Sequence, residues 1–106
     1  MTNELKDKTI DKKQEQSYHL IGKKWTGLII HTLMEQPKRF SEIHSIIPDL
    51  SKRVLNERLK ELENSGVIIR NVVTDRPVKI EYSLTEKGSE LGTALKSLEN
   101  WADKWL

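Results

Sequence analysis

The segment LSKRVLNERLKELENSG, residues Leu50 to Gly66, decides the fold that the sequence predicts. Leu55, Leu59 and Leu62 recur at the i, i+4 and i+7 spacing that places them on one face of a helix. The side chains off that face are basic or polar: Lys52, Arg53, Asn56 and Lys60. A helix anchored by leucines that presents Lys, Arg and Asn near its N-terminal end has the form of a major-groove reader. An ordinary amphipathic surface helix is the alternative, since solvated faces are also rich in Lys and Arg.

The ends of this helix carry their own signals. Ser51 is a candidate N-cap, because its hydroxyl can accept a hydrogen bond from a free N–H of the first turn, and Asp49 is the rival candidate. Gly66 is the matching stop, since glycine supplies the positive φ that commonly follows the last helical residue.

Composition predicts a single small soluble domain. The chain has 106 residues, of which 36% are hydrophobic and 32% charged, and it contains no cysteine. Disulfides, thiolate metal sites and cysteine-based redox sensing are therefore excluded for this sequence. No apolar run approaches the roughly 18 residues of a membrane span, and no signal-peptide pattern opens the chain, so we expect a cytoplasmic protein without membrane contact.

The distribution of charge is more informative than its total. A net charge of +2 is too small to indicate nucleic acid by itself. The stretch from Ser51 to Lys60, however, carries four basic side chains against the single carboxylate of Glu57. A local basic face of this kind is the electrostatic pattern expected of a DNA-binding surface.

The residues before this segment predict a tail and two helices. Met1 to about Thr9 is polar and is predicted to be a disordered tail. A helix with a weak apolar stripe is predicted over residues 10–21, and Gly22 breaks or bends the chain. The next helix places Trp25, Leu28, Ile29 and Leu33 in the core and ends near Gln36, because Pro37 restricts its predecessor.

A helix-turn-helix follows. Residues 38–40 are too few for more than a short strand or an extended link, and Ser41 is the predicted N-cap of the next helix. Pro48 and Asp49 end that short helix and turn the chain into the Ser51 helix. The apolar stripe expected on the short helix comprises Ile43, Ile46, Ile47 and Leu50.

After Gly66 the apolar period changes from 3.6 to 2, which predicts a hairpin. The alternating residues are Val67, Ile69 and Val73 in the first strand and Val78, Ile80, Tyr82 and Leu84 in the second. Thr74 to Pro77 are turn formers, and Arg76 lies at the tip. A hairpin directly after a helix-turn-helix is the layout of a winged helix. Arg76 is either a solvated turn residue or a contact to the minor groove, where negative potential favours arginine.

Thr85 is predicted to cap a last helix with Glu86 in its first turn. At about 20 residues, or on the order of 30 Å, this helix is longer than a core of this size can cover. Its apolar stripe therefore predicts self-association, and the alternative is that its tryptophans fold back on the first helix. The predicted dimerisation residues are Leu95, Leu98, Trp101 and Trp105.

The predicted class is thus mainly α with a small β-hairpin (α+β), a winged helix-turn-helix with a long C-terminal dimerisation helix. Enzyme chemistry finds little support, because His19, His31 and His44 are widely spaced and no cluster has metal-ligand spacing. Neither catalytic residues nor a metal or cofactor are predicted.

Four segments carry a family resemblance: LIGKKWTGLIIHTL, PKRFSEI, LSKRVLNERLKELENSGVI and VKIEYSLTEKG. In this order and spacing, roughly from Leu20 to Trp101, they resemble the HxlR-type winged-helix transcriptional regulators of bacteria and archaea, which are related more distantly to the MarR group. The resemblance implies a homodimer that binds a palindromic operator in double-stranded DNA. A winged-helix protein-interaction module without DNA binding is the alternative, and an apolar or acidic recognition helix would distinguish it.

The resemblance also implies residue roles. It places Ser51, Lys52, Arg53 and Asn56 on the DNA-facing side, and Arg58 at a usually basic position, where it would serve a phosphate or pair with Glu61 or Glu57. Lys38 and Arg39 are expected phosphate contacts from the edge. Many members sense oxidants through a cysteine whose position is Lys12 here, and the second glycine of a usual pair is Lys23, an added candidate phosphate contact. No residue identifies a small-molecule effector.

Overall fold

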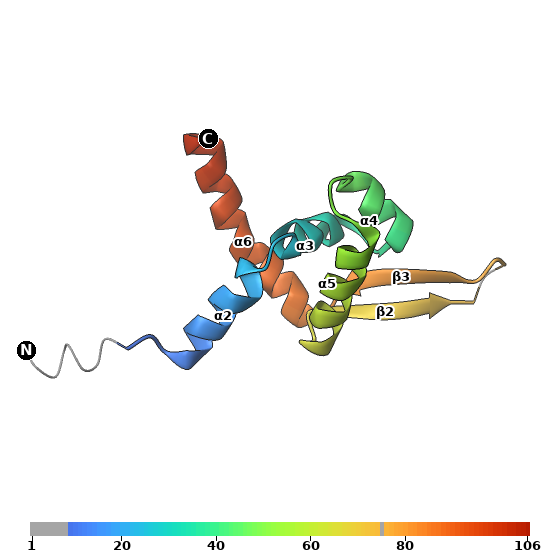
Figure 1. Ribbon diagram of the computed structural model, residues 1–106, viewed down its shortest axis with the longest axis horizontal. Helices are drawn as coiled ribbons and strands as arrows, with labels where there is room; N and C mark the ends of the chain where they lie inside the picture. The colour runs from blue at the N-terminus through green and yellow to red at the C-terminus, as the bar shows by residue number, and fades with distance from the viewer. Residues whose placement is uncertain (1–8, 75) are drawn as a thin grey trace, which may run out of the picture.

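The computed structural model describes residues 9–74 and 76–106, which form five helices and one three-stranded antiparallel sheet (Figure 1). The disordered tail was predicted for Met1 to about Thr9, and all of it except Thr9 lies outside the described part of the chain, as does Asp75 of the predicted turn. The elements, in chain order, are α2 (Lys12–Gly22), α3 (Thr26–Glu35), β1 (Lys38–Arg39), α4 (Phe40–Ile46), α5 (Lys52–Asn64), β2 (Ile68–Val73), β3 (Lys79–Leu84) and α6 (Glu86–Trp105). This is the predicted winged helix-turn-helix.

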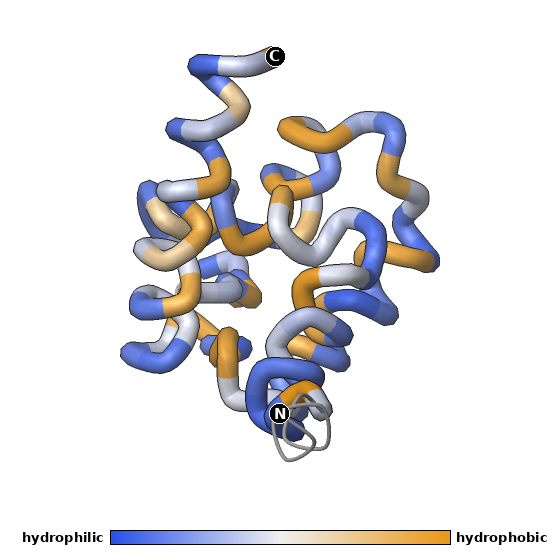
Figure 2. The backbone as a smooth tube through the Cα atoms, turned by 90° about the vertical axis from the view of Figure 1, so that its left-hand side faces the viewer, coloured by the Kyte–Doolittle hydropathy of each residue, from blue (hydrophilic) through white to orange (hydrophobic). Residues whose placement is uncertain are grey.

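The core forms where α3, α4 and α5 meet the sheet. Leu55, Leu59 and Leu62 of α5 are at most 1% exposed, which confirms the predicted leucine face. Ile29 and Ile30 of α3 are completely buried in the same cluster. In Figure 2 hydrophobic residues recur along each helix between hydrophilic ones, the pattern of helices that bury one face.

Helix α5 begins and ends as predicted. The Ser51 hydroxyl accepts a hydrogen bond from the Val54 N–H at 3.1 Å, so Ser51 and not Asp49 is the N-cap. Gly66 follows the helix with a φ of 76°, a conformation that glycine adopts without the steric cost that a side chain would add.

The start of α4 differs from the prediction. Its N-cap is Arg39 and not Ser41, because the Glu42 carboxylate accepts a hydrogen bond from the Arg39 N–H at 2.8 Å. That hydrogen bond is the main reason why the pKa of Glu42 lies below its usual value. The helix also ends at Ile46, whose side chain is 54% exposed, so the predicted buried stripe is wrong at this residue.

Strand β3 lies in the centre of the sheet, between β1 and β2. Ile68 pairs with Leu84 and is 2% exposed, whereas Ile69 is 48% exposed, so the predicted alternation of this strand is shifted by one residue. Val67 precedes the strand and is itself buried, and the register with β3 places Ile68, Arg70 and Val72 on the same face as Tyr82. Beyond the helices the hairpin projects as a wing, where Ile80 is 37% exposed (Figure 1).

A cluster of hydrogen bonds joins the end of α5 to the start of α6. The Thr85 N–H donates to the Val67 carbonyl at 3.1 Å, and the Lys87 ammonium donates to the Ser65 carbonyl at 2.6 Å. The Thr85 hydroxyl accepts from the Gly88 N–H at 3.1 Å, which confirms Thr85 as the predicted N-cap of α6. We call this cluster the α5–α6 junction.

Only the first half of α6 packs on the core, where Gly88 lies against Val67 and Gly92 lies against Met34 of α3. Its second half extends away from the body of the domain (Figure 1). Trp101 and Trp105 are 52% and 65% exposed, so neither tryptophan is buried against α2. No helix in the described residues has both the length and the apolarity of a membrane span.

Candidate nucleic-acid interface

The exposed side of α5 is the candidate DNA-binding surface, and we call it the reading face. It comprises Lys52, Arg53, Asn56 and Lys60, all of which are exposed. The leucines beneath them are buried, so the helix cannot rotate without exposing its apolar side. The geometry thus fixes which side chains are presented to a partner.

Arg53 and Asn56 lie about one turn apart on this face. The Arg53 side chain is 78% exposed, and its Nη1 atom lies 2.9 Å from Oε1 of Glu57. An exposed pair at i, i+4 contributes little to stability, so a DNA base can compete for this guanidinium at small cost. Arginine suits the O6 and N7 acceptors of guanine, and asparagine suits adenine.

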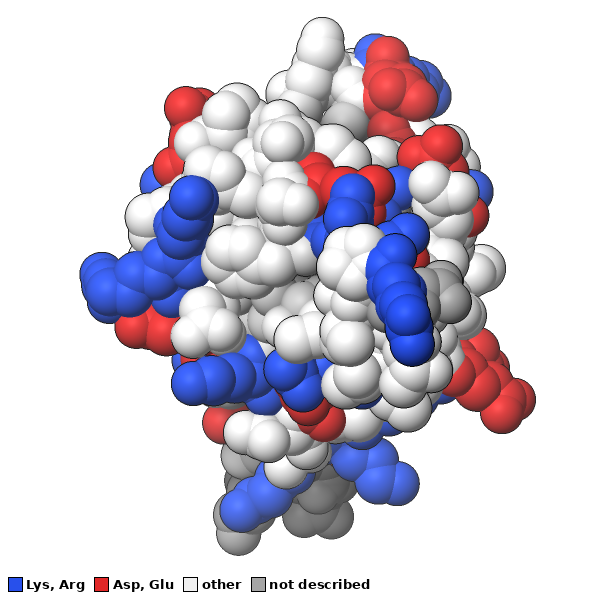
Figure 3. Space-filling view, turned by 90° about the vertical axis from the view of Figure 1, so that its right-hand side faces the viewer, with Lys and Arg blue, Asp and Glu red and all other residues white. Residues whose placement is uncertain are grey.

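Two further predicted contacts flank the reading face. The exposed Ser51 caps α5 with its oxygen, and its hydroxyl proton is still available to donate to a phosphate. Arg76 is exposed in the turn between β2 and β3, at the end of the wing. Figure 3 views the molecule from the wing side and shows several separate Lys and Arg groups, with Asp and Glu among them. The basic side chains are therefore gathered locally and do not cover the whole surface, in keeping with the small net charge of +2.

The structure does not place Lys38 where a phosphate contact was expected. Its side chain is 7% exposed and lies on the inner face of the sheet, because Lys38 pairs in register with the buried Tyr82. Its ammonium is 4.0 Å from the Glu35 carboxylate. Arg39 is 49% exposed, with Nε 3.5 Å from Glu42, and it stays accessible from the edge.

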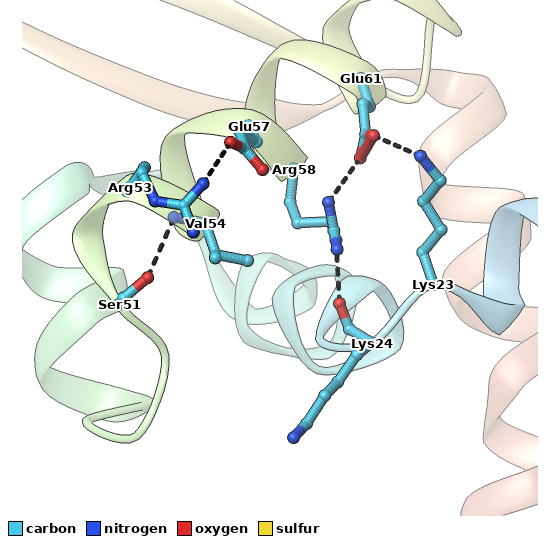
Figure 4. Close-up of polar contacts among 8 residues, drawn as sticks. All are labelled: Lys23, Lys24, Ser51, Arg53, Val54, Glu57, Arg58 and Glu61. Atoms are coloured by element: carbon cyan, nitrogen blue, oxygen red, sulfur yellow. Dashed lines mark hydrogen bonds and ion pairs between the residues drawn. The ribbon is translucent and has the colours of Figure 1, made fainter.

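Arg58 points away from the reading face, toward the link between α2 and α3 (Figure 4). Its Nε donates to the Lys24 carbonyl at 3.0 Å and its Nη1 donates to Glu61 at 3.1 Å. Of the two predicted ion-pair partners, Glu61 is therefore the one observed. The side chain of Arg58 is 18% exposed, which does not fit a phosphate contact.

Lys23 takes part in the same group. Its ammonium lies 2.5 Å from the second oxygen of Glu61, so this lysine is engaged inside the domain rather than free for a phosphate. The hydrogen bond from Lys23 is the largest reason why the pKa of Glu61 lies below its usual value, and the charge of Arg58 acts in the same direction. Sequence reasoning missed this pairing because Lys23 and Glu61 are 38 residues apart.

The predicted dimerisation stripe is only partly covered by its own domain. Leu95 packs against the core, whereas Leu98, like both tryptophans, is more than half exposed. Leu28 was predicted to lie in the core, but it is 52% exposed. It lines a groove of about 470 Å³ between α3 and α6, together with Trp25, Leu95 and Leu98. The exposed stripe thus continues into a groove that the sequence did not reveal.

No group of three or more His, Asp or Glu side chains within residues 9–74 and 76–106 is arranged to hold a metal ion.

A family model described as HxlR-like helix-turn-helix matches residues 20–106. The chain belongs to the HxlR-like family. Its elements and its buried leucines are accordingly those of a helix-turn-helix transcriptional regulator, and the resemblance stated from the sequence is confirmed.

The chain is similar to named regulators and to solved structures. The HTH-type transcriptional regulator YodB of Bacillus subtilis is 47% identical over 97 residues, which cover 92% of this chain and 87% of YodB. The solved reduced form of YodB superposes with a TM-score of 0.83 at 46% identity, covering 92% of this chain and 95% of that structure. A MarR-family regulator from Porphyromonas gingivalis superposes with a TM-score of 0.85 at 28% identity, covering 93% of this chain and 99% of that structure.

Some relatives have also been solved in oxidised or chemically treated forms. YodB has been solved after diamide treatment and bound to a quinone. The redox regulator HypR, solved in its oxidised form, is 36% identical with a TM-score of 0.80, covering 85% of this chain and 93% of that structure. The present chain contains no cysteine.

Proposed function

We propose that this HxlR-like protein is a cytoplasmic, non-enzymatic regulator that binds a palindromic operator in double-stranded DNA as a homodimer. The observation that carries the proposal is the reading face, in which Lys52, Arg53, Asn56 and Lys60 are exposed above a buried row of leucines. The wing with Arg76 extends from the same domain. Major-groove contact by the helix and contact by the wing would together cover one half-site.

The far end of α6 supports the homodimer. Leu98, Trp101 and Trp105 are each more than half exposed and lie on one side of α6, and large exposed apolar patches commonly mark protein–protein contacts. A second copy packing its own α6 on this stripe would bury both surfaces at once. A two-fold dimer presents two reading faces related by symmetry, and such a pair selects inverted repeats.

Selection of bound fragments from a random DNA pool tests the proposal directly. We expect an enriched inverted repeat whose half-sites are about one helical turn apart. A pool that stays unenriched while the protein remains folded would refute DNA recognition and favour a protein-interaction module. Enrichment of a single unrepeated half-site would refute the symmetric dimer alone.

Some residues of the reading face and the wing are predicted to recognise bases, and others are predicted to contact phosphates. Arg53→Ala should weaken operator binding by about 1–3 kcal/mol per half-site and leave non-specific binding nearly unchanged. Lys60→Ala or Arg76→Ala should weaken both, and should flatten the salt dependence by about one unit of slope per lost phosphate contact. Fluorescence anisotropy with operator and scrambled duplexes at several salt concentrations separates these patterns.

Glu57→Gln is a suitable control, because it removes the ion-pair partner of Arg53 without touching the guanidinium. It should leave operator preference intact. If Arg53→Ala weakens operator and scrambled duplexes equally, Arg53 contacts the backbone and the assignment of the base-reading residue is wrong.

Binding by the purified protein should be insensitive to thiol oxidants, because the chain offers no thiol. Diamide at a concentration that oxidises a reference thiol should leave the operator affinity unchanged within error. Release of DNA by diamide would contradict the prediction. If binding is insensitive to diamide, this regulator is controlled through its abundance, a protein partner or a small-molecule effector whose identity no residue reveals.

A further inference from the structure

Four groups form a contact between α5 and the α2–α3 turn, and we call it the clamp. They are the side chains of Lys23, Arg58 and Glu61 and the main-chain carbonyl of Lys24 (Figure 4). Glu61 accepts from Lys23 with one oxygen and from Arg58 with the other. Arg58 in turn donates from two different nitrogens to two different elements.

The position of Arg58 on α5 separates it from DNA. At 100° per residue, Arg58 lies roughly 160° around the helix from both Asn56 and Lys60. Its side chain is 18% exposed, against 78% for Arg53. A groove that accepts the reading face therefore leaves Arg58 on the far flank of the helix.

The clamp also fixes an unusual piece of backbone. Trp25 precedes α3 with a φ of 81°, which a bulky side chain rarely adopts. The carbonyl that Arg58 binds belongs to the peptide between Lys24 and Trp25, so its direction changes with this φ. The hydrogen bond thus ties the conformation of the turn to the position of α5.

The turn faces the dimer side of the molecule as well. Lys23, Lys24 and Trp25 line the groove that Leu95 and Leu98 of α6 also border. One short segment consequently contacts both the recognition helix and the surface beside the exposed stripe.

We propose that Arg58 and Glu61 are positioning residues for DNA recognition, which hold α5 against the α2–α3 turn and couple its orientation to the groove beside α6. The proposal rests on the proposed DNA-binding function. It assigns no DNA contact to either residue. A planar guanidinium is required, because one group must reach the Lys24 carbonyl and Glu61 together, and an ammonium lacks that fork.

The test compares Arg58→Lys, Arg58→Gln and Glu61→Gln with the unmodified protein on the selected operator and on a scrambled duplex. All three variants should lose about tenfold or more in operator affinity per half-site, with scrambled binding within about twofold and the salt slope unchanged. Thermal unfolding by circular dichroism sets a temperature at which every variant is folded. A folded variant that no longer prefers the operator over the scrambled duplex could not be explained by destabilisation alone.

Glu61→Gln tests whether operator affinity falls or rises. Removing a negative charge from a DNA-binding helix should strengthen binding if charge alone matters. The exposed Glu63 on the same helix is the matched control, and Glu63→Gln should leave affinity unchanged or slightly raised. Weaker operator binding by Glu61→Gln alone supports the clamp, and stronger binding by both variants would overturn it.

Two further outcomes would also overturn the proposal. One is full operator preference in Arg58→Lys, and the other is a salt slope lowered by about one in Arg58→Gln, which marks a phosphate contact. The amide resonance of Trp25 in the DNA-free protein is a separate readout, and it should shift in Arg58→Lys but not in Lys60→Gln. If no DNA is selected by the unmodified protein, the proposed function fails, while an unshifted Trp25 amide would contradict the clamp itself.

Discussion

Gly88→Ala is expected to lower the free energy of unfolding by about 3 kcal/mol. Gly88 lies in the first turn of α6 and is buried against the chain that follows α5. A methyl group there would overlap the Val67 carbonyl oxygen and lie 3.0 Å from its carbonyl carbon. The obstacle is backbone held by the Thr85 N–H, so it cannot move aside without breaking the α5–α6 junction.

Two other glycines make matched controls. A methyl group at Gly92 would meet the flexible side chain of Met34, which can move, so Gly92→Ala should cost less than Gly88→Ala. Gly27 in α3 has open space around the corresponding position, and Gly27→Ala should be neutral or stabilising by about 0.5–1 kcal/mol.

Urea unfolding followed by circular dichroism measures all three free energies. The predicted order of stability is Gly27→Ala, then Gly92→Ala, then Gly88→Ala. Equal stabilities for the Gly88 and Gly27 variants would show that α6 can move away from Val67, and that the junction is looser than the structure indicates.

Replacing Leu98 and Trp101 by aspartate is expected to give a monomer and to lower operator affinity by about two to four orders of magnitude. The effect is large because a dimer binds its second half-site as an intramolecular event, which monomers lose. Both side chains are more than half exposed in the single chain, so the change should leave the domain folded.

Sedimentation measures the association state, and anisotropy measures DNA binding. Asn100→Asp is the control, because Asn100 is exposed on the opposite side of α6 from the stripe and gains one charge without losing apolar area. It should stay dimeric. An unmodified protein that sediments as a monomer at micromolar concentration would refute the dimer outright.

Features fixed within a few residues of chain could be predicted from the sequence. The leucine spacing of α5, the Ser51 and Thr85 caps and the stop at Gly66 each depend on local geometry, and each is confirmed. The winged arrangement followed because the change of apolar period is also local.

Features that depend on distant partners were harder to predict. Lys38 was expected at the surface, and only its pairing with Tyr82 in β3 shows that it lies inside. The burial of Ile68 rather than Ile69 depends on how the chain leaves Gly66, and a shift of one residue reverses every side chain of a strand. Within the clamp only the local pair of Arg58 with Glu61 was among the predictions, whereas Lys23 and Glu61 are 38 positions apart and Arg58 and Lys24 are 34 apart, so no local pattern marks those contacts.

The α5–α6 junction has a mechanical consequence. Because Thr85 and Lys87 bind the carbonyls of Val67 and Ser65, α6 and the end of the recognition helix should move together as one stiff arm. The arm is a helix of 20 residues, or about 30 Å, with its free end at the exposed tryptophans. Tilting such an arm by about 10° would displace its far end by roughly 5 Å, which exceeds the axial spacing of one base pair, about 3.4 Å. Small changes in how two such arms cross would therefore alter the register between half-sites.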